Sequence, residues 1–389
     1  MKMTTDKIKQ KIECGEIKAI TLDTNIFDQK QNGLESGLLR QMEQFNGAIT
    51  TVVFSDVVLR EVESHIKEAA SNSQAALKST LKSVGNAWHV SKNIRTETLN
   101  NYFGASSPKE IAKKRVREFV EGTGAEIVAA GEAVNVHELI ERYFSPKPPF
   151  AERKDKKNEF PDALALMSLD RWAEDNGQKI LVVTNDGDWE AYCEFSEWLI
   201  AINDLQGALT LFQSQSAEYV CQQLVEQIRG GDPLAFVDAI ERAIYDDLDS
   251  QFDFEPSADS HMGVEWSWPP EVSLGGVSIR GLDGKDFHLK PIKFTKDQLI
   301  VALEVDVHAD FICDFDFFVY DSIDKEDVPM GSTEAETSTD LVVEVLVTLG
   351  GEMPKCDEVQ GVEIIKQRVV VDFGYIDPFE HEDPTHEKY

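Results

Sequence analysis

The sequence has few cysteines, no long apolar run and little positive charge, and each shortage argues against a class of protein. Its five cysteines are odd in number and scattered, without a C-x-x-C pair, so neither a disulfide framework nor a zinc knuckle is indicated. No stretch approaches the ~20 apolar residues of a membrane span, and residues 1–18 lack the apolar core of a signal peptide. We therefore expect a cytoplasmic protein without a membrane partner.

The shortage of positive charge is concentrated in one half of the chain. The 389 residues include 38 Lys and Arg against 71 Asp and Glu, a formal net charge of −33. Residues 1–200 hold 26 basic and 31 acidic residues, whereas residues 201–389 hold 12 and 40. Such an acidic chain repels phosphate, but this objection to a nucleic-acid partner is weak for the nearly neutral first half. In the second half the acids are expected mainly to keep the protein soluble.

Apolar runs alternate with helical patterns in the first half. Strands are expected at 18–22, 48–54, 179–183 and 198–202. Helices are expected after Ser55, whose hydroxyl can cap a helix, and at 158–175 and 204–229, with further helices inserted at about 70–145. Strands alternating with helices predict an α/β fold, a parallel sheet covered by helices on both faces.

The pattern changes after about residue 231, where the first domain (1–231) is expected to end. A helix at 233–248 and an acidic linker at 249–262 make up a connecting segment, 232–262. Period-two alternation then predicts an antiparallel all-β domain over 263–389, a sandwich or a roll. Its strands are expected at 272–280, 286–294, 298–308, 311–320, 340–349 and 362–374, and an acidic loop is expected at 321–339.

Four acids lie where a parallel sheet binds ligands. Asp23 and Asp186 each follow a predicted strand, while Glu61 and Asp162 lie in early turns of the neighbouring helices. Ligands of open α/β sheets bind outside the carboxyl ends of the strands. Carboxylates that converge there repel one another and need a hard divalent cation, Mg²⁺ or Mn²⁺, which can activate water and stabilise phosphoryl charge. Taken alone, each acid is more often a helix cap or a solvated charge.

In this order the motifs resemble the PIN domain nuclease family, and more closely a PIN-like group found in bacteria. The resemblance covers about residues 18–205. It is carried by Asp23-Thr24-Asn25, by Glu61, by Lys157-Asn158-Glu159-Phe160-Pro161-Asp162-Ala163, and by Thr184-Asn185-Asp186-Gly187-Asp188-Trp189.

The resemblance implies a three-layer α/β/α fold and metal-dependent hydrolysis of phosphodiester bonds, in RNA more than in DNA. It implies that Asp23, Glu61, Asp162 and Asp186 are the catalytic and metal-binding acids. Asp188 would be an accessory metal ligand, and Asn25, Thr184 and Glu159 would support the site. Family analogy also suggests a bacterial toxin or an antiviral defence effector.

A basic run just before the third motif is a candidate nucleic-acid contact. Arg153, Lys154, Lys156 and Lys157 precede Asp162 by a few residues and could guide a phosphate backbone towards the acids. A solvated surface balanced by Glu152 and Asp155 is equally compatible with the sequence. For the basic cluster at 109–117 the solvated helix face is favoured, and for Trp189 core packing is favoured.

Several alternatives stay open. The inserted helices at 70–145 suit a lid, a substrate clamp or a dimer surface, so a homo-oligomer is one expectation. The acidic β domain suits solubility, a regulatory protein partner, or a nucleic-acid mimic that covers the site. A catalytically silent PIN-fold scaffold that binds RNA or protein through its acidic domain is the main alternative function. An aspartyl-phosphate phosphatase is disfavoured, because it needs a second acid where this chain has Asn25.

Overall fold

The structure is a computed structural model that describes residues 3–104, 106–145, 147–150, 159–213, 215–231, 235–282, 284, 287–321, 325–351, 356 and 358–377. The chain divides into two units, Met1–Gln213 and Ser214–Tyr389, each built around its own sheet. Across the described residues, no helix has both the length and the apolar character that crossing a membrane requires.

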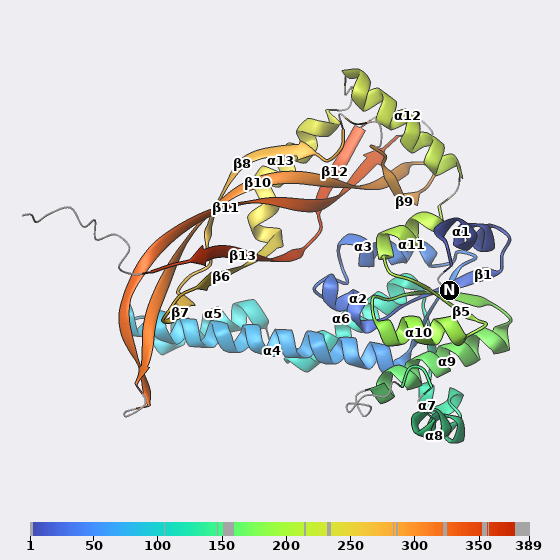
Figure 1. Cartoon of the computed structure of the whole chain (residues 1–389), viewed down its shortest axis with the longest axis horizontal. Coiled ribbons are helices and arrows are strands. Elements are labelled where there is room, and N and C mark those ends of the chain that lie inside the picture. Colours follow the sequence, from blue (N-terminus) through green and yellow to red (C-terminus); the bar gives the residue numbers. More distant parts are fainter. Residues whose placement is uncertain are drawn as a thin grey trace, which may run out of the picture. The chain divides into compact units, whose positions relative to one another are not determined.

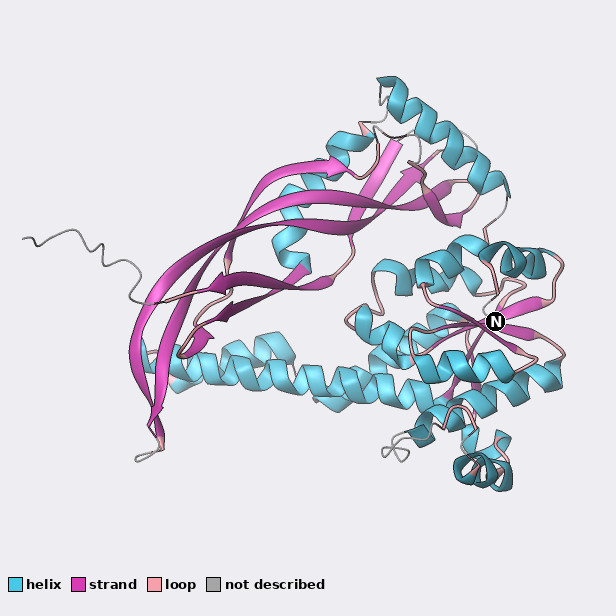
Figure 2. Ribbon diagram, in the orientation of Figure 1, coloured by secondary structure: helices cyan, strands magenta, loops and turns pink. Residues whose placement is uncertain are grey.

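A five-stranded parallel sheet forms the centre of the first unit. Its order is β3-β2-β1-β4-β5, and every neighbouring pair is parallel. The strands are β1 (Ile17–Leu22), β2 (Thr51–Ser55), β3 (Glu126–Val128), β4 (Lys179–Val183) and β5 (Leu199–Ile202). Helices lie on both faces of the sheet (Figure 2). The predicted parallel α/β architecture is therefore confirmed.

The helices of the first unit follow the strands in the alternation that the sequence predicted. They are α1 (Thr5–Glu13), α2 (Thr24–Gln29), α3 (Gly37–Arg40), the 3-10 helix η1 (Gln41–Phe45), α4 (Asp56–Ala87), α5 (Lys92–Phe103), α6 (Pro108–Thr123), α7 (Ala130–Ala133), α8 (Val136–Phe144), α9 (Phe160–Asn176), α10 (Gly187–Phe195) and α11 (Leu205–Leu211). As predicted, the Ser55 hydroxyl caps α4, accepting a hydrogen bond from the Val57 amide at 3.4 Å.

Two details of the first unit differ from the predictions. Strand β3 was not predicted, because it is three residues long and its Glu126 and Ile127 are exposed, which leaves no apolar run to detect. The predicted long helix at 204–229 is wrong: α11 ends at Leu211, and α12 (Gln215–Gly231) follows. At the break Phe212 packs edge-on against Phe45, and the Gln213 amide donates to Gln44. Tertiary contacts thus end a helix that local sequence would continue.

The second unit is mostly antiparallel strands around one long hairpin. Strands β10 (Gln298–Asp321) and β11 (Glu326–Gly350) pair from Gln298–Gly350 to Asp321–Glu326 (Figure 1). β7 (Gly263–Trp266), β8 (Glu271–Ile279) and β9 (Lys290–Phe294) pair with β10, and β12 (Glu358–Ile364) pairs with β11. The predicted antiparallel character is confirmed.

Apolar residues of the hairpin share one core with two helices. Alternate residues of β10, such as Val301, Val305 and Phe311, are fully buried together with Leu224 of α12 and Ile240 of α13 (Phe236–Gln251). Helices α12 and α13, which precede the predicted β domain, thus pack against its sheet. Helix α12 groups with this second unit, so the division falls before the predicted end of the first domain at residue 231.

Several boundaries in the second half were predicted wrongly. The strand predicted at 362–374 is two strands, β12 and β13 (Gln367–Tyr375), which pair with β11 and β6 (Phe252–Asp259) respectively. At the other boundaries, acids obscure the alternation. The predicted linker at 249–262 contains β6, in which Phe252 and Phe254 are buried between acids; it pairs in parallel with β13. Most of the predicted loop at 321–339 belongs to β11. There half-buried Thr and Ala alternate with exposed acids and Ser, and Thr suits strands. The two predicted strands at 298–308 and 311–320 are one strand, β10.

Candidate active site

The topology of the sheet places the candidate acids at its switch point. From β1 the chain moves outward through β2 to β3, then returns to the other side of β1 as β4 and continues to β5. The carboxyl ends of β1 and β4 therefore flank the crevice where open α/β sheets bind ligands. Asp23 directly follows β1, and Thr184 directly follows β4. The Asp23 amide donates to the Val183 carbonyl at 3.0 Å, which fixes the two strand ends side by side.

Thr184 connects Asp23 to Asp186. Its hydroxyl donates to Asp23 Oδ2 at 2.7 Å and accepts from the Asp186 amide at 2.9 Å. Asp186 in turn caps α10, because its Oδ1 accepts from the amides of Asp188 and Trp189 at 2.7 and 3.1 Å. The side chain of Asp23 is 4% exposed, and Thr184 is buried. One hydroxyl thus orients a buried carboxylate and the turn that carries the next acid.

The other two acids are held by donors from neighbouring elements. Glu61, in the second turn of α4, accepts a hydrogen bond from the Thr24 hydroxyl at 2.8 Å. Asp162, in the first turn of α9, accepts from the indole N–H of Trp189 at 2.8 Å. Each of the four carboxylates thus accepts at least one hydrogen bond. A carboxylate has about four lone-pair sites, so these bonds leave capacity for a further ligand.

The acids act on one another electrostatically. Burial, together with the charges of Asp162 and Asp186, raises the pKa of Asp23 to about 7, although the hydrogen bond from Thr184 lowers it. Burial likewise raises the pKa of Asp162 to about 6, together with the charges of Glu61, Asp186 and Asp188. Among the described residues, no lysine or arginine forms an ion pair with Asp23, Glu61, Asp162 or Asp186. In the described part of the chain, the site therefore concentrates negative charge without a paired cation.

The donor chemistry of this site fits a hard divalent cation. The donors are carboxylate oxygens, which Mg²⁺ and Mn²⁺ prefer, and a bound cation would relieve the repulsion that raises the two pKa values. A further acceptor lies beside the acids in sequence, since the buried Oδ1 of Asn25 has no hydrogen-bond donor. The side chains do not form a ready-made cluster: in the described part of the chain, no three acids, histidines or cysteines are grouped closely enough to hold a metal ion.

The remaining predicted site residues have different placements. Asp188 is half-buried in the first turn of α10, near enough to Asp162 to raise its pKa. Glu159 is buried at the position before α9. The predicted nucleic-acid contacts Arg153, Lys154, Lys156 and Lys157 lie outside the described residues.

Two functional contacts were missed by sequence reasoning. Trp189 packs in the core as predicted, 1% exposed, yet its indole also donates to Asp162. Thr24 was quoted as part of a motif, but its role as the donor to Glu61 was not anticipated. A threonine directly after the first acid was a signal for the second contact, because it begins α2 beside the site. The residues around Trp189 give no sign of its hydrogen bond to Asp162, which is 27 residues away in the sequence.

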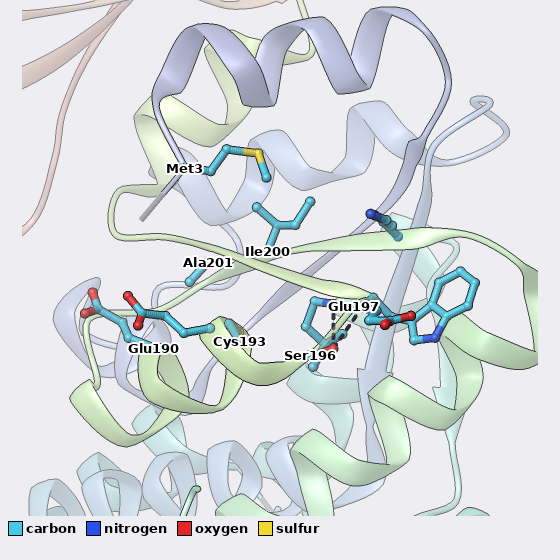
Figure 3. Close-up of a pocket in the computed structure, with 11 residues that line it drawn as sticks. Met3, Glu190, Cys193, Ser196, Glu197, Ile200 and Ala201 are labelled. Carbon is cyan, nitrogen blue, oxygen red and sulfur yellow. Dashed lines mark hydrogen bonds between the residues drawn. The ribbon is translucent and has the colours of Figure 1, made fainter. Parts of the chain in front are cut away.

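A pocket of about 420 Å³ lies elsewhere in the first unit (Figure 3). It is lined mainly by α10 and by β5 with the residues just before it, including Glu190, Cys193 and Ile200, and none of the four candidate acids lines it. This pocket and the switch point of the sheet are therefore two separate places, and the acids belong to the switch point.

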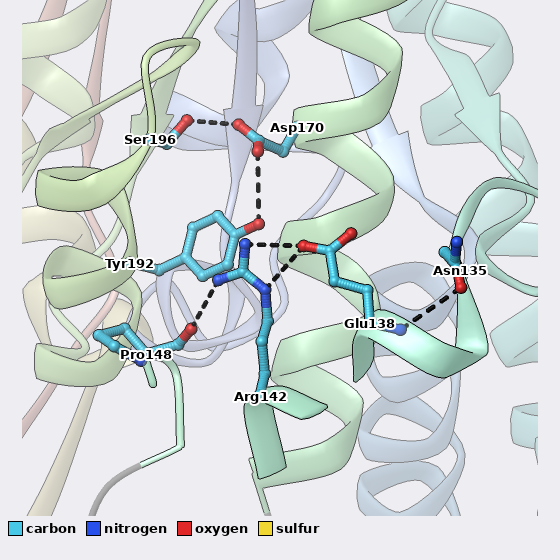
Figure 4. A network of polar contacts seen from close by, with 7 residues as sticks. All are labelled: Asn135, Glu138, Arg142, Pro148, Asp170, Tyr192 and Ser196. Carbon is cyan, nitrogen blue, oxygen red and sulfur yellow. Dashed lines mark hydrogen bonds and ion pairs between the residues drawn. The ribbon is translucent and has the colours of Figure 1, made fainter. Parts of the chain in front are cut away.

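A second carboxylate on α9, the half-buried Asp170, belongs to a structural network instead (Figure 4). Asp170 accepts hydrogen bonds from the hydroxyls of Ser196 and Tyr192. The guanidinium of Arg142 lies over the Tyr192 ring, 5.1 Å from its centre, and pairs with Glu138 at 3.0 Å. The network connects α8, α9 and α10. Burial raises the pKa of Asp170 too, but hydroxyls and a cation surround it, whereas acids surround Asp162.

Comparison with known protein families agrees with this geometry. The family model of the PIN domain matches residues 20–189, from β1 into α10. This part of the chain is a PIN domain. The match includes all four candidate acids, and PIN domains are generally nucleases. The C-terminal unit has no family assigned to it. Neither a curated protein nor a solved structure matches the chain.

Proposed function

We propose that the PIN domain is a metal-dependent nuclease that hydrolyses phosphodiester bonds, with Asp23, Glu61, Asp162 and Asp186 as its essential acids. The observation that carries this proposal is that these acids lie at the same end of the sheet and act on one another electrostatically. Side chains from four separate elements act on one another at the switch point of the sheet, and two of them have raised pKa values that other acids help to raise. Acids that served only as caps or surface charges have no reason to raise one another's pKa values in this way.

The residues have distinct tasks in this proposal. Asp23 and Asp162 would hold the cation together with Glu61 and Asp186, and Asp188 would serve as an accessory ligand. Thr184, Thr24 and Trp189 orient the carboxylates through the hydrogen bonds described above. When bound, a divalent cation supplies activated water near neutral pH and neutralises charge on the phosphoryl oxygen.

The finer parts of the proposal rest on the PIN family. Family analogy supports RNA over DNA as substrate, and a toxin or antiviral setting. Five scattered cysteines without a C-x-x-C pair suit a reducing compartment such as the cytoplasm. The acidic second unit is proposed as a surface for a regulatory protein.

The experiment is a cleavage assay on single-stranded and duplex RNA and DNA with Mn²⁺, Mg²⁺ or EDTA. Wild type is compared with Asp162→Asn, a near-isosteric loss of one charge, and with Asp170→Asn as the matched control on the same helix. We expect cleavage that needs the cation, that is lost in Asp162→Asn and that is retained in Asp170→Asn. Folded wild type that binds nucleic acid but cuts nothing under any cation would instead identify a scaffold.

A further inference from the structure

The strongest feature outside the acid site is an arm formed by α4 and α5. Helix α4 is 32 residues long and begins at the acid edge of the sheet, where Ser55 caps it and Glu61 lies in its second turn. The structure describes all of residues 56–87. After Ile66, Gly85 is the one buried residue of this helix. Helix α5 has no buried residue and follows α4 after a short turn (Figure 1). The arm is therefore far longer than its packing requires.

The arm has a local excess of positive charge in an acidic protein. Residues 69–103 contain four cations and a single acid, Glu97, in a chain whose formal net charge is −33. Three of the cations are exposed lysines: Lys78 and Lys82, one turn apart on α4, and Lys92 at the start of α5. The fourth, Arg95, packs against Gly85 and is part of the arm's internal structure.

Exposed aromatic and aliphatic side chains lie among these lysines. Trp88, at the turn between the two helices, is 79% exposed, and Tyr102 on α5 is 75% exposed. Ile94 and Val84 are also exposed. Aromatic rings left in water beside lysines are the combination that binds unpaired nucleic acid, because bases stack on the rings while cations contact the backbone.

We propose that the α4–α5 arm, residues 69–103, is a binding surface for single-stranded nucleic acid. It leads a strand along α4 to the acids at the end of the sheet. Charge complementarity favours nucleic acid as the ligand of the arm, since positive charge attracts a polyphosphate. The exposed rings favour an unpaired strand over a duplex, whose bases are stacked on each other. This inference rests on the proposed nuclease function for the site to which the strand is led.

The geometry sets a length requirement. At 1.5 Å per residue, Lys78 lies about 25 Å and Trp88 about 40 Å from Glu61 along the helix. An oligonucleotide that occupies the acids alone does not reach these side chains. Substitutions on the arm should therefore weaken binding of long strands and leave short ones unaffected.

The test is the affinity of full-length protein for labelled single strands in EDTA, so that nothing is cut. The probes are oligo(U) and oligo(dT) of about 30 and about 6 nucleotides, above and near the low end of known site sizes, and a duplex of the longer length. The variants are Lys78→Ala/Lys82→Ala/Lys92→Ala and Trp88→Ala/Tyr102→Ala. The matched control is Lys109→Ala/Lys113→Ala/Lys114→Ala, three exposed lysines of α6 in the same unit. All the altered side chains are exposed, so folding should be retained, and a thermal melt checks this.

We expect the lysine variant to raise the Kd for the long strand at least about tenfold. It should also reduce the slope of log Kd against log salt by about 2, the value for three phosphate contacts on a single strand. The aromatic variant should raise the Kd for the long strand with little change in that slope. The α6 control should change Kd much less than the arm variants.

Equal binding by wild type and arm variants would overturn the inference, as would failure of wild type to bind the long strand. A change of oligomeric state in the arm variants without a change in Kd would overturn it in favour of an interface between two copies. Cleavage of the short strand with Mn²⁺ keeps the two proposals separate. Binding without any cleavage refutes the nuclease alone, whereas cleavage with unaltered binding by the arm variants refutes the arm alone.

Discussion

The two units of this protein use carboxylates in opposite ways. In the PIN domain a few acids follow strand ends and turn inward, so that Asp23 is buried and Asp162 lies among other acids. In the second unit the acids lie on the outer face of the β10–β11 hairpin, alternating with buried apolar residues. There they meet hydroxyls and cations: Asp310 accepts from Ser338, and Asp306 pairs with Arg280 at 3.1 Å.

The difference shows that placement, and not number, indicates a site. Residues 201–389 hold 40 of the 71 acids, yet the acids that raise one another's pKa values lie in the first unit. A carboxylate on a solvated strand face costs little to keep charged, whereas a buried one near other acids is costly to ionise. Such a costly arrangement is characteristic of functional sites.

The largest effect is expected from a variant that removes Asp23, the most buried of the four candidate acids. Asp23→Asn should lower metal-dependent cleavage by at least about 100-fold, more than the loss typical of a residue that only orients a ligand. The same change should raise the melting temperature of the metal-free protein near neutral pH. The reason is that the neutral amide avoids the cost of an ionised carboxylate, on the order of 1–4 kcal/mol from its raised pKa.

Cleavage rates and metal-free melting curves measure both effects. The control is Asp314→Asn on the exposed face of β10, which should change neither. A loss of activity accompanied by a lower melting temperature would show that Asp23 is structural.

The next effect concerns the hydroxyl that orients two acids. Thr184→Val keeps the shape of a buried side chain but removes the donor to Asp23 and the acceptor for the Asp186 amide. We expect cleavage to fall about 10- to 100-fold, mainly through weaker metal binding. A titration of activity against Mn²⁺ measures this. Thr184→Ser, which restores the hydroxyl, should recover most of the activity, and equal losses in the two variants would contradict the orienting role.

The raised pKa values also predict how stability depends on pH. As the pH falls through about 7 and about 6, folded Asp23 and Asp162 take up protons, whereas the unfolded chain, with pKa values near 3.8, does so only at lower pH. The folded state then holds more protons than the unfolded state, so lowering the pH from 7.5 to about 5 should contribute stability to the metal-free protein.

Thermal melts of wild type and of the double variant Asp23→Asn/Asp162→Asn isolate this contribution from the rest of the acidic chain. The double variant should gain less stability over the same pH interval, and equal gains would refute the assignment. Mn²⁺ should stabilise wild type more at about pH 7.5 than at about pH 5.5, because protons compete with the metal for the carboxylates.

The sequence was informative where a pattern is local. Buried strands such as Ile17–Leu22 and Lys179–Val183 are short apolar runs, and strand ends in a parallel sheet must share an edge, so the positions of Asp23 and Asp186 could be predicted. The hydrogen bond from Trp189 to Asp162 depends on how two helices pack, which no local pattern specifies.

The second unit was harder to predict because its strands are rich in acids. Alternation in residues 333–340 of β11 sets Thr and Ala against Glu, Ser and Asp, and this part of the strand has the composition of a loop. β11 pairs with β10 over the whole length of both strands. The backbone hydrogen bonds of this pairing stabilise a strand that its weak apolar pattern did not predict.

The smallest expected effect tests the outer face of that hairpin. Asp314 and Glu334 are direct cross-strand partners, and both are exposed. Like charges in this position repel, so Glu334→Lys, which creates an opposite-charge pair, should stabilise the second unit by about 0.2–1 kcal/mol. Chemical denaturation at low salt measures the gain, and high salt should reduce it. Cleavage should stay unchanged, because the change adds no group to the acid site of the PIN domain. A large loss of cleavage would instead mean that this acidic face takes part in the reaction, and the contrast between the two units would fail.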